Sequence, residues 1–427
     1  MSATTHVTIE MQVAARFRAT RRRTLALCEP LTPEDMMVQS SPETSPAKWH
    51  LAHTAWFFES FILREFMPGY RLFNADFPWL FNSYYRSFAS FPQKHLRASF
   101  SRPGLDEILR YRAHVDEAIE RLMESSPEPE AVQRVELGVN HEEQHQELLL
   151  TDILHAFFTN PLRPIYQPEP AAAGAANARE EAEPLRFVKF AGGLCEIGHN
   201  GEGFCFDNEL ARHRVWLEPY AFGQRQVTNR EFAAFIADGG YRRPELWLSA
   251  GWDAVEQNGW GAPLYWTDDD GEWSLFTLRG PQPLARLASS PVCHVSYFEA
   301  DAYARWAGRR LATEFEWEAA AEGQPVAGNL LDSGQLVPSQ AMAPAQEQHP
   351  TQQFGDCWEW TASAYLGYPG FRPLPGSLGE YNGKFMNGQM VLRGGSCVTP
   401  AAHIRSSYRN FFAPETRWQF SGIRLAE

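Results

Sequence analysis

The sequence predicts an α+β protein in two parts, a four-helix bundle followed by an irregular, loop-rich α+β domain. The first ~165 residues carry apolar side chains at helical spacing and few strand signals. The residues after ~185 are instead rich in Gly, Trp, Tyr and short strand-like runs. Between them lies PEPAAAGAANAREEAEPL, whose small and charged side chains cannot form a packed face. We therefore expect a bundle over residues 1–165, a linker over 166–185 and the α+β domain over 186–427.

The bundle is predicted from four amphipathic segments, which make a four-helix bundle when their apolar faces pack together. The second segment begins at Ser45-Pro46, a capping residue followed by a proline at the first helical position, and Pro68-Gly69 ends it. The predicted helices cover roughly residues 8–28, 45–67, 103–122 and 130–158.

The C-terminal part is predicted to be a small sheet with long loops, an arrangement that places binding residues on the loops. Two helices are predicted, over 297–308 and 313–321. The strand-like segments are FAGGLCEIG, APLYW, GEWSLFTL, CWEWT and VLRGGSCV.

The net charge indicates which classes of ligand the protein binds, and the cysteine pattern indicates the cellular compartment. The formal charge is −14, and no block of Lys or Arg is longer than residues 21–23, which argues against a nucleic-acid or anionic-membrane partner. The six cysteines form no C-x-x-C pair, the N-terminus lacks the order of a signal peptide, and no apolar run approaches the roughly 20 residues that span a bilayer. We expect a reduced, cytoplasmic protein that binds small molecules. Its oligomeric state stays open.

Residues 141–149, HEEQHQELL, contain the H-E-x-x-H pattern that zinc peptidases use. On a helix, His141 and His145 share one face and can bind a common metal, but a third ligand is needed. A peptidase would use Glu142 as general base and would take its third ligand from downstream. Only His155 follows closely, and it lies off the ligand face. The peptidase reading therefore lacks a good third ligand.

An upstream helix offers the alternative third ligand, because WHLAH carries His50 and His53. A histidine pair on one helix facing a single histidine on another is how bundle cores build metal sites. Sequence spacing does not choose between His50 and His53. Three neutral nitrogens leave open positions on an octahedral ion, which suits an oxygen-activating Fe(2+) centre better than a closed structural zinc site.

Several segments together resemble one family, the ergothioneine-biosynthesis sulfoxide synthases, over nearly the whole chain apart from the linker. The resemblance to that family's DinB-like bundle is carried by SSPETSPAKWHLAHTAWFFESFIL, LFNSYYRS, SRPGLDEILRYRAHVDEAI and VNHEEQHQELLLTDILHAF. The resemblance to its formylglycine-generating-enzyme-like (C-type-lectin-like) domain is carried by VTNREFAAFI, RRLATEFEWEAAA, FGDCWEWTASAYLGYPGF, VLRGGSCVT and RSSYRNFFAPETRWQFSGIRLA.

The resemblance implies a non-haem iron(II) enzyme that uses O2 to join a thiol to the imidazole C2 of hercynine, the trimethylated form of histidine, as a sulfoxide. It places the iron ligands on His53, His141 and His145, with His50 as the alternative to His53. It matches Gln144 to a glutamine that contacts the substrate imidazole. Glu142 is then expected to be exposed or to lie behind the ligands.

The resemblance also implies a catalytic pair, Tyr84 and Tyr85 in NSYYRS, one of which donates a proton or hydrogen bond during oxygen activation. A phenol suits this role because it is a hydrogen-bond donor with a pKa near ~10.

Two further segments bear on the substrates. Asn410 and Phe411 match positions that meet the trimethylammonium group, which an aromatic face attracts. Phe412 matches the cysteine-using branch of the family rather than the branch that uses gamma-glutamylcysteine. The loop 86–100 departs from the family's Gly- and Arg-rich pattern. Its cations, Arg86, Lys94 and Arg97, are either carboxylate ligands or surface charges.

Formylglycine generation is not expected, because that chemistry needs two cysteines after the R-G-G-S motif and only Cys397 is present there. The prediction is thus a sulfoxide synthase acting on cysteine and hercynine. The alternatives are another thiol or histidine derivative, or a zinc peptidase.

Overall fold

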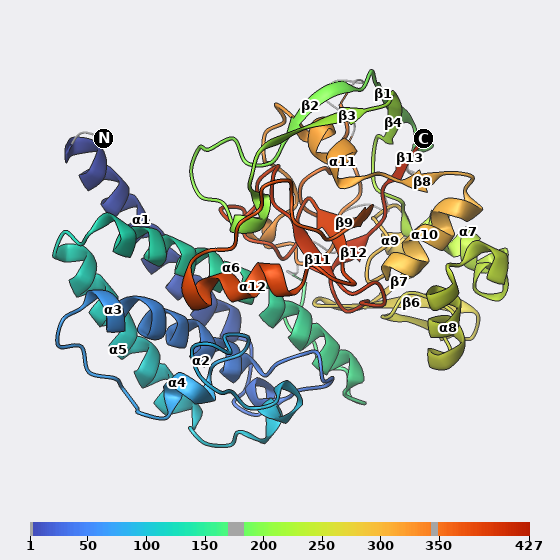
Figure 1. The fold of residues 1–427 in the computed structure, drawn as a ribbon. Coiled ribbons are helices and arrows are strands. Elements are labelled where there is room, and N and C mark those ends of the chain that lie inside the picture. Colours follow the sequence, from blue (N-terminus) through green and yellow to red (C-terminus); the bar gives the residue numbers. More distant parts are fainter. Residues whose placement is uncertain (1–2, 170–182, 343–348) are drawn as a thin grey trace. The chain divides into compact units, whose positions relative to one another are not determined.

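The computed structural model describes residues 3–169, 183–342 and 349–427 and has the α+β composition that the sequence predicts (Figure 1). The chain divides into two compact units. Unit 1 comprises Met1–Leu162 and a return of the chain at Leu374–Tyr381, and unit 2 comprises Arg163–Pro373 and Asn382–Glu427. Most of the predicted linker, residues 170–182, lies outside the described residues. No helix in the described parts of the chain is long and apolar enough to cross a membrane.

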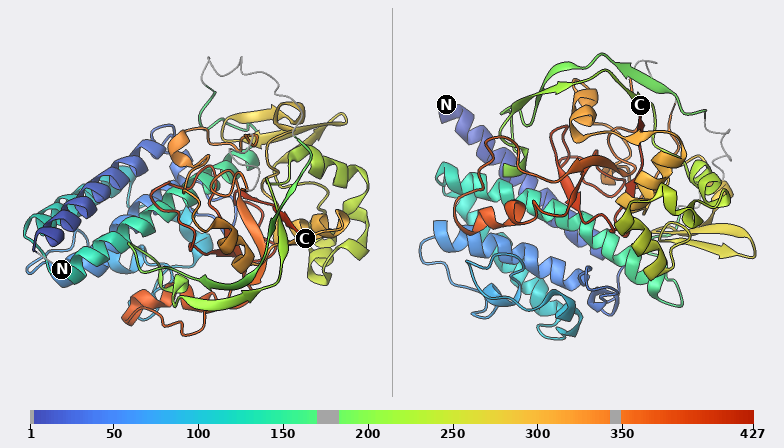
Figure 2. Two further views of the ribbon diagram at one scale, coloured as in Figure 1. Left: turned by 90° about the horizontal axis from the view of Figure 1, so that it is seen from above. Right: turned by 45° about the vertical axis from the view of Figure 1, so that its right-hand side comes forward.

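Unit 1 is built on four long helices, as predicted. Helices α1 and α2 each pack along α6, and α2 also packs on α5 (Figures 1 and 2). Arg112 of α5 links three of them, because its guanidinium donates to the Leu51 carbonyl and to Thr54 of α2, and to Glu142 of α6. The four helices are α1 (Ala3–Cys28), α2 (Ala47–Phe58), α5 (Leu105–Glu124) and α6 (Pro129–Thr159). The shorter elements of the unit are η1 (Asp35–Met37), α4 (Phe77–Leu80) and η3 (Lys94–Ser99).

The second predicted helix differs in detail from the expectation. Pro46 occupies the capping position rather than the first helical position, and the backbone N–H of Ser45 donates to Asp152 at 2.8 Å. The helix continues beyond α2 as the π-helical turn η2 (Glu59–Leu63) and the short α3 (Arg64–Phe66). Glu59 is fully buried in this turn, and its carboxylate accepts hydrogen bonds from the Tyr70 and Tyr111 hydroxyls.

Close packing of α2 on α6 depends on Gly138, one turn before His141. A Cβ at this position would lie 2.5 Å from a ring carbon of Phe58. That ring is fully buried and contacts Phe17 edge to face at 5.0 Å, so it has little room to move.

We expect Gly138→Ala to lower the free energy of unfolding by about 1–2 kcal/mol, because overpacking outweighs the ~1 kcal/mol gain in helix propensity. Denaturant unfolding measures the change. In a Phe58→Ala background the same substitution is expected to be neutral or stabilising. Gly104→Ala, where a Cβ meets nothing within 4 Å, is the control. A Gly138→Ala protein as stable as the parent would contradict this account of the packing.

The described residues of unit 2 form two four-stranded sheets, a β2–β3 hairpin and a three-stranded β5–β6–β7 sheet. The first sheet has the order β1 (Phe187–Phe190), β4 (Tyr220–Gly223), β13 (Leu425–Ala426) and β8 (Arg310–Leu311). The second has the order β11 (Asn410–Phe412), β10 (Met390–Arg393), β9 (Trp358–Ala364) and β12 (Ser421–Gly422). The other strands are β2 (Gly193–Ile197), β3 (His213–Leu217), β5 (Trp266–Asp269), β6 (Glu272–Thr277) and β7 (Gly280–Pro283). Each strand-like segment of the sequence contributes to a strand, although APLYW does so only through its last residue, Trp266.

Three α-helices of unit 2 start at capping boxes. The two predicted helices are present as α10 (Tyr297–Trp306) and α11 (Glu314–Ala321), and the sequence reading missed α7 (Asn229–Ala237) and α8 (Ser249–Asn258). Helix α7 carries the same signal as the other two, because Thr228 and Glu231 form a capping box like those before α10 and α11. The remaining short elements are η5 (Asp207–Glu209), η6 (Gly240–Arg242), η7 (Pro244–Leu246), α9 (Leu284–Leu287), η8 (Leu331–Ser333), η9 (Gly376–Gly379) and α12 (Glu380–Lys384).

Candidate metal centre

Three histidines of unit 1 converge at the contact between α2 and α6. One potential ligand atom from each of His53, His141 and His145 lies within 4.8 Å of the other two. The centroids of these three rings are 4.6–5.1 Å apart. His141 and His145 are one helical turn apart on α6, and His53 faces them from α2. Within the part of the chain that the structure describes, this is the one group of three side chains arranged to hold a metal ion.

His53 is held between two indole rings. Its imidazole stacks on Trp49 at 4.4 Å and on Trp56 at 5.1 Å, each with an interplanar angle of 14°. The Nδ1 atom lies 2.6 Å from the backbone carbonyl oxygen of Phe81. A carbonyl only accepts hydrogen bonds, so Nδ1 carries the proton and Nε2 keeps the lone pair that a metal needs.

All three histidines are neutral near pH 7. Burial lowers the pKa of His141 to about 3, and burial together with the neighbouring imidazoles holds the pKa values of His53 and His145 well below the usual range. The neutral imidazole is the form that binds metals. The ring of His141 stacks on Phe57 at 4.4 Å, and its buried Nδ1 has no hydrogen-bond partner among the described residues.

His50, the alternative ligand, is not part of the group. Its Nδ1 lies 2.8 Å from Nδ1 of His145, and its Nε2 lies 3.0 Å from a carboxylate oxygen of Asp152. Both of its nitrogens therefore have protein partners, which favours His53 as the ligand. His155 is directed elsewhere, because its Nδ1 lies 2.6 Å from the Ser40 hydroxyl.

Glu142 is fully buried, so of its two expected positions exposure is wrong and a position behind the ligands remains. Its carboxylate accepts hydrogen bonds from Arg21 at 2.8 Å, Arg112 at 2.9 Å and Thr24 at 2.7 Å. These interactions hold its pKa at about 2, although burial alone would raise the pKa. A carboxylate bound by two arginines on the side of α6 that faces α1 and α5 is not available to activate water. The geometry therefore opposes the peptidase reading.

The donor set fits a divalent transition-metal ion. Three neutral imidazoles are ligands that iron, zinc, copper and nickel all accept. The unpartnered Nδ1 of His141 is a buried polar atom, and coordination of a metal by this nitrogen would satisfy it.

The two predicted tyrosines lie in the segment that follows α4, and both belong to unit 1. Tyr85 is buried, with its ring 5.7 Å from Trp56 and 5.0 Å from Phe61. The ring of Tyr84 is 5.8 Å from that of Tyr381. Through Trp56, Tyr85 is one side chain removed from His53.

Tyr381 reaches Tyr84 because residues 374–381 return to unit 1. The Glu380 carboxylate accepts hydrogen bonds from the backbone N–H groups of Arg86 and Ser87, at 3.2 and 2.8 Å. The hydroxyls of Ser87 and Ser377 are 2.8 Å apart. Sequence reasoning missed Tyr381, because no spacing links it to the tyrosine pair almost 300 residues earlier.

The three cations of the loop 86–100 have different surroundings. Arg86 is exposed, and its guanidinium lies over Phe91. Lys94 forms an ion pair with the exposed Glu43 at 3.3 Å, as a surface charge does.

Arg97 is only 4% exposed, so the surface-charge alternative does not hold for it. Its guanidinium carbon lies 3.4 Å from the ring centroid of Trp49, the residue that stacks on His53. Ser45 and Ser83 each accept a hydrogen bond from it at 2.8 Å, and no carboxylate among the described residues forms an ion pair with it. Burial lowers its pKa to about 10, so it stays charged near pH 7.

The other predicted substrate residues fall in both units. Gln144 is half-buried on α6, one residue before His145. Asn410, Phe411 and Phe412 form β11 in unit 2, paired with β10. The ring of Phe411 stacks on Tyr365 at 4.0 Å. Their role in substrate binding stays a prediction.

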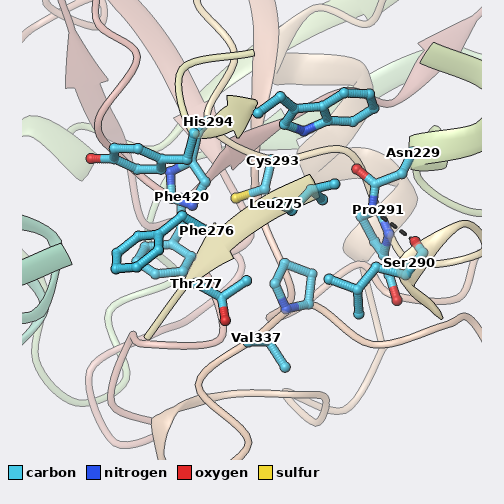
Figure 3. Close-up of a pocket in the computed structure, with 14 residues that line it drawn as sticks. Asn229, Leu275, Phe276, Thr277, Ser290, Pro291, Cys293, His294, Val337 and Phe420 are labelled. Atoms are coloured by element: carbon cyan, nitrogen blue, oxygen red, sulfur yellow. Dashed lines mark hydrogen bonds between the residues drawn. The ribbon is translucent and has the colours of Figure 1, made fainter. Parts of the chain in front are cut away.

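A separate pocket lies within unit 2 and is lined mainly by apolar side chains such as Leu275, Phe276 and Phe420 (Figure 3). His294 and Cys293 also line it. Burial lowers the pKa of His294 to about 3, and its Nδ1 is 2.9 Å from the Gln419 carbonyl oxygen. This pocket has no group of three metal-ligating side chains in the described residues.

Comparison with known proteins assigns both parts of the chain. Residues 16–149 match the DinB superfamily model, and residues 172–350 and 351–427 match the model of the sulfatase-modifying factor enzyme 1-like domain. A formylglycine-generating enzyme of Streptomyces coelicolor is 35% identical over 36% of this chain and 53% of its own length.

Three hercynine oxygenases match over almost their full lengths. That of Mycolicibacterium smegmatis is 32% identical, covering 95% of this chain and 96% of its own. That of Mycobacterium tuberculosis is 32% identical, covering 97% of this chain and 98% of its own. The formylglycine-generating enzyme matches about a third of this chain, whereas these hercynine oxygenases match nearly all of it. By this full-length similarity the chain belongs to the hercynine oxygenase family of oxidoreductases.

Proposed function

We propose that this protein is a non-haem iron(II) sulfoxide synthase that joins cysteine to the imidazole C2 of hercynine with O2. The observation that carries the proposal is the cluster of neutral imidazoles from the buried His53 and His141 and the half-buried His145. The full-length similarity to hercynine oxygenases supports the same reaction.

The reaction needs no external reductant. The thiol loses its S–H hydrogen and the imidazole loses its C2 hydrogen as the C–S bond forms. One oxygen atom of O2 is added to sulfur and the other leaves as water, so the two substrates supply all four electrons. Iron(II) bound by the three histidines would supply redox chemistry and open coordination positions that bring the reactants together.

The protein's own residues have four tasks in this proposal. Arg97 binds the carboxylate of cysteine, because it is a buried cation that forms no direct ion pair with a carboxylate among the described residues, although Asp152 is near enough to offset part of the lowering of its pKa by burial. Gln144 contacts the substrate imidazole through its side-chain amide. Tyr84 or Tyr85 donates its phenolic proton while O2 is reduced, which favours sulfoxide formation over simple oxidation of the thiol.

Recognition of the trimethylammonium group is the fourth task, assigned to Asn410 and Phe411. Phe411 is in an aromatic cluster, with Tyr365 stacked on it at 4.0 Å and Phe385 at 5.7 Å. Such a cluster attracts a quaternary ammonium, which has no proton to donate. Phe412 supports cysteine as the thiol, by its match to the cysteine-using branch of the family.

The test is anaerobic reconstitution with Fe(II) followed by O2, cysteine and hercynine, with mass detection of the sulfoxide adduct. Parallel reactions with gamma-glutamylcysteine and with histidine identify the thiol and the imidazole substrate. In the same assay we expect Tyr84→Phe or Tyr85→Phe to divert product from the sulfoxide to cysteine sulfinate by about tenfold or more, the scale of a lost proton donor. An absence of adduct with every pair of substrates would refute the proposed function. Unchanged product ratios in both variants would remove the tyrosines from it.

A further inference from the structure

Asp152, His50 and His145 form a continuous hydrogen-bonded chain that ends at the metal cluster. The Asp152 carboxylate oxygen is 3.0 Å from Nε2 of His50, and Nδ1 of His50 is 2.8 Å from Nδ1 of His145. Asp152 and His50 are 6% and 2% exposed, so water does not compete strongly for these bonds. The function proposed above does not use either residue.

The chemistry of these groups determines where the protons are. An ionised carboxylate only accepts hydrogen bonds, so Nε2 of His50 is the donor to Asp152. An imidazole with a single N–H that donates it from Nε2 accepts at Nδ1, so in this tautomer Nδ1 of His50 is an acceptor. The facing Nδ1 of His145 must therefore be the donor, which leaves the lone pair of His145 on Nε2.

We propose that Asp152 and His50 are positioning residues that keep the proton of His145 on Nδ1 and so present its Nε2 to the metal. His53 obtains the same tautomer directly from the Phe81 carbonyl. For His145 the hydrogen-bond acceptor is the imidazole of His50 instead of a carbonyl, and the Asp152 carboxylate binds the far side of that imidazole. This inference rests on the metal centre proposed above.

The Asp152 carboxylate also explains why the hydrogen-bonded series from Asp152 through His50 to His145 can be held rigidly. The same oxygen of Asp152 accepts the backbone N–H of Ser45 at 2.8 Å, immediately before α2 begins. Asp152 thus ties the start of α2 to α6, and His50 lies on the first turn of α2. The partner of His145 and the ligand His53 are consequently positioned by the same helix.

The test compares two substitutions of His50 with the parent. His50→Phe keeps a ring but can neither accept from His145 nor donate to Asp152. His50→Gln offers an amide oxygen and an amide N–H that can replace both bonds. His155→Phe is the matched control, because His155 is on α6 but bonds to Ser40 instead. His145→Ala serves as the reference for a lost ligand.

Fe(II) affinity is measured anaerobically by competition with a chelator, and the visible spectrum of the Co(II)-loaded protein reports the ligand geometry. We expect His50→Phe to weaken Fe(II) binding about 10–100-fold, the usual effect of losing a residue that orients a metal ligand, and to alter the Co(II) spectrum. His50→Gln should recover most of the affinity, and His155→Phe should match the parent.

The possible results distinguish a failure of the proposed positioning role from a failure of the proposed metal centre. Equal Fe(II) binding by the parent and His145→Ala would overturn both. If the parent needs His145 for Fe(II) binding, two results would overturn the positioning role alone. One is a His50→Phe variant with the parent's affinity, and the other is a His50→Gln variant that binds no better than His50→Phe. If His50→Phe does not fold, 15N spectra of the parent's histidine rings decide the matter. An N–H on Nε2 of His145, identified by its loss in His145→Ala, would contradict the assigned tautomer.

Discussion

Replacing His141 with alanine is expected to abolish iron binding and sulfoxide formation. His141 and His145 are one turn apart on α6, and His53 completes the group, so removal of one ring leaves two ligands that do not make a tight site. Loss of a residue that only orients a ligand costs about 10–100-fold in affinity, so the loss of a ligand should cost more than ~100-fold. Iron content after anaerobic reconstitution and the rate of adduct formation are the measurements.

The fold of this variant should survive. The contact between α2 and α6 extends well beyond His141, and the Glu142 ion pairs with Arg21 and Arg112 remain. His114→Ala is the control, because His114 is a half-buried histidine on α5 that lies outside the cluster. A well-folded His141→Ala protein that retains the parent's iron and activity would show that the metal centre is elsewhere.

Replacing Arg97 with methionine is expected to raise the KM for cysteine by about 30-fold or more. Removal of one partner of a buried, hydrogen-bonded charge pair costs roughly 2–5 kcal/mol, and each ~1.4 kcal/mol is a factor of ten. Methionine keeps much of the apolar contact with Trp49 but removes the charge that would bind the substrate carboxylate. Steady-state kinetics with varied cysteine measure the change.

Cysteamine, which is cysteine without its carboxylate, provides the decisive comparison. The parent should strongly prefer cysteine, and Arg97→Met should lose most of that preference because its activity with cysteamine changes little. Arg110→Met, an exposed substitution on α5, is the control. An Arg97→Met variant that still prefers cysteine over cysteamine as strongly as the parent would assign the carboxylate to another cation.

The helices of unit 1 could be predicted closely because each is set by local signals. Apolar side chains repeat at helical spacing in all four, and Pro68-Gly69 marks the end of the second. The observed start of a helix differs from the predicted one where a capping residue forms a hydrogen bond with a distant part of the chain. Ser45 has the chemistry of a cap, but its N–H is drawn to Asp152, more than 100 residues away. Helix α7 was missed although its capping box at Thr228 and Glu231 was readable.

The candidate site was only partly readable for the same reason. The spacing of His141 and His145 predicts a shared face, because the helical period alone determines that relation. The choice between His50 and His53 depends on how α2 is rotated against α6, which no local pattern records. The burial of Arg97 against Trp49 and the return of Tyr381 to Tyr84 likewise join residues that are distant in the sequence.

The sequence by itself determined the two-part organisation, the helical bundle, the pair of histidines on α6 and, through its motifs, the family resemblance. These depend on residue type and short-range spacing, which are present in the unfolded chain. The tertiary structure alone decided that Glu142 is bound by two arginines rather than free to act as a base, and that His50 connects Asp152 to His145. Those roles depend on partners from other helices, and such partners exist only when α1, α2, α5 and α6 pack together.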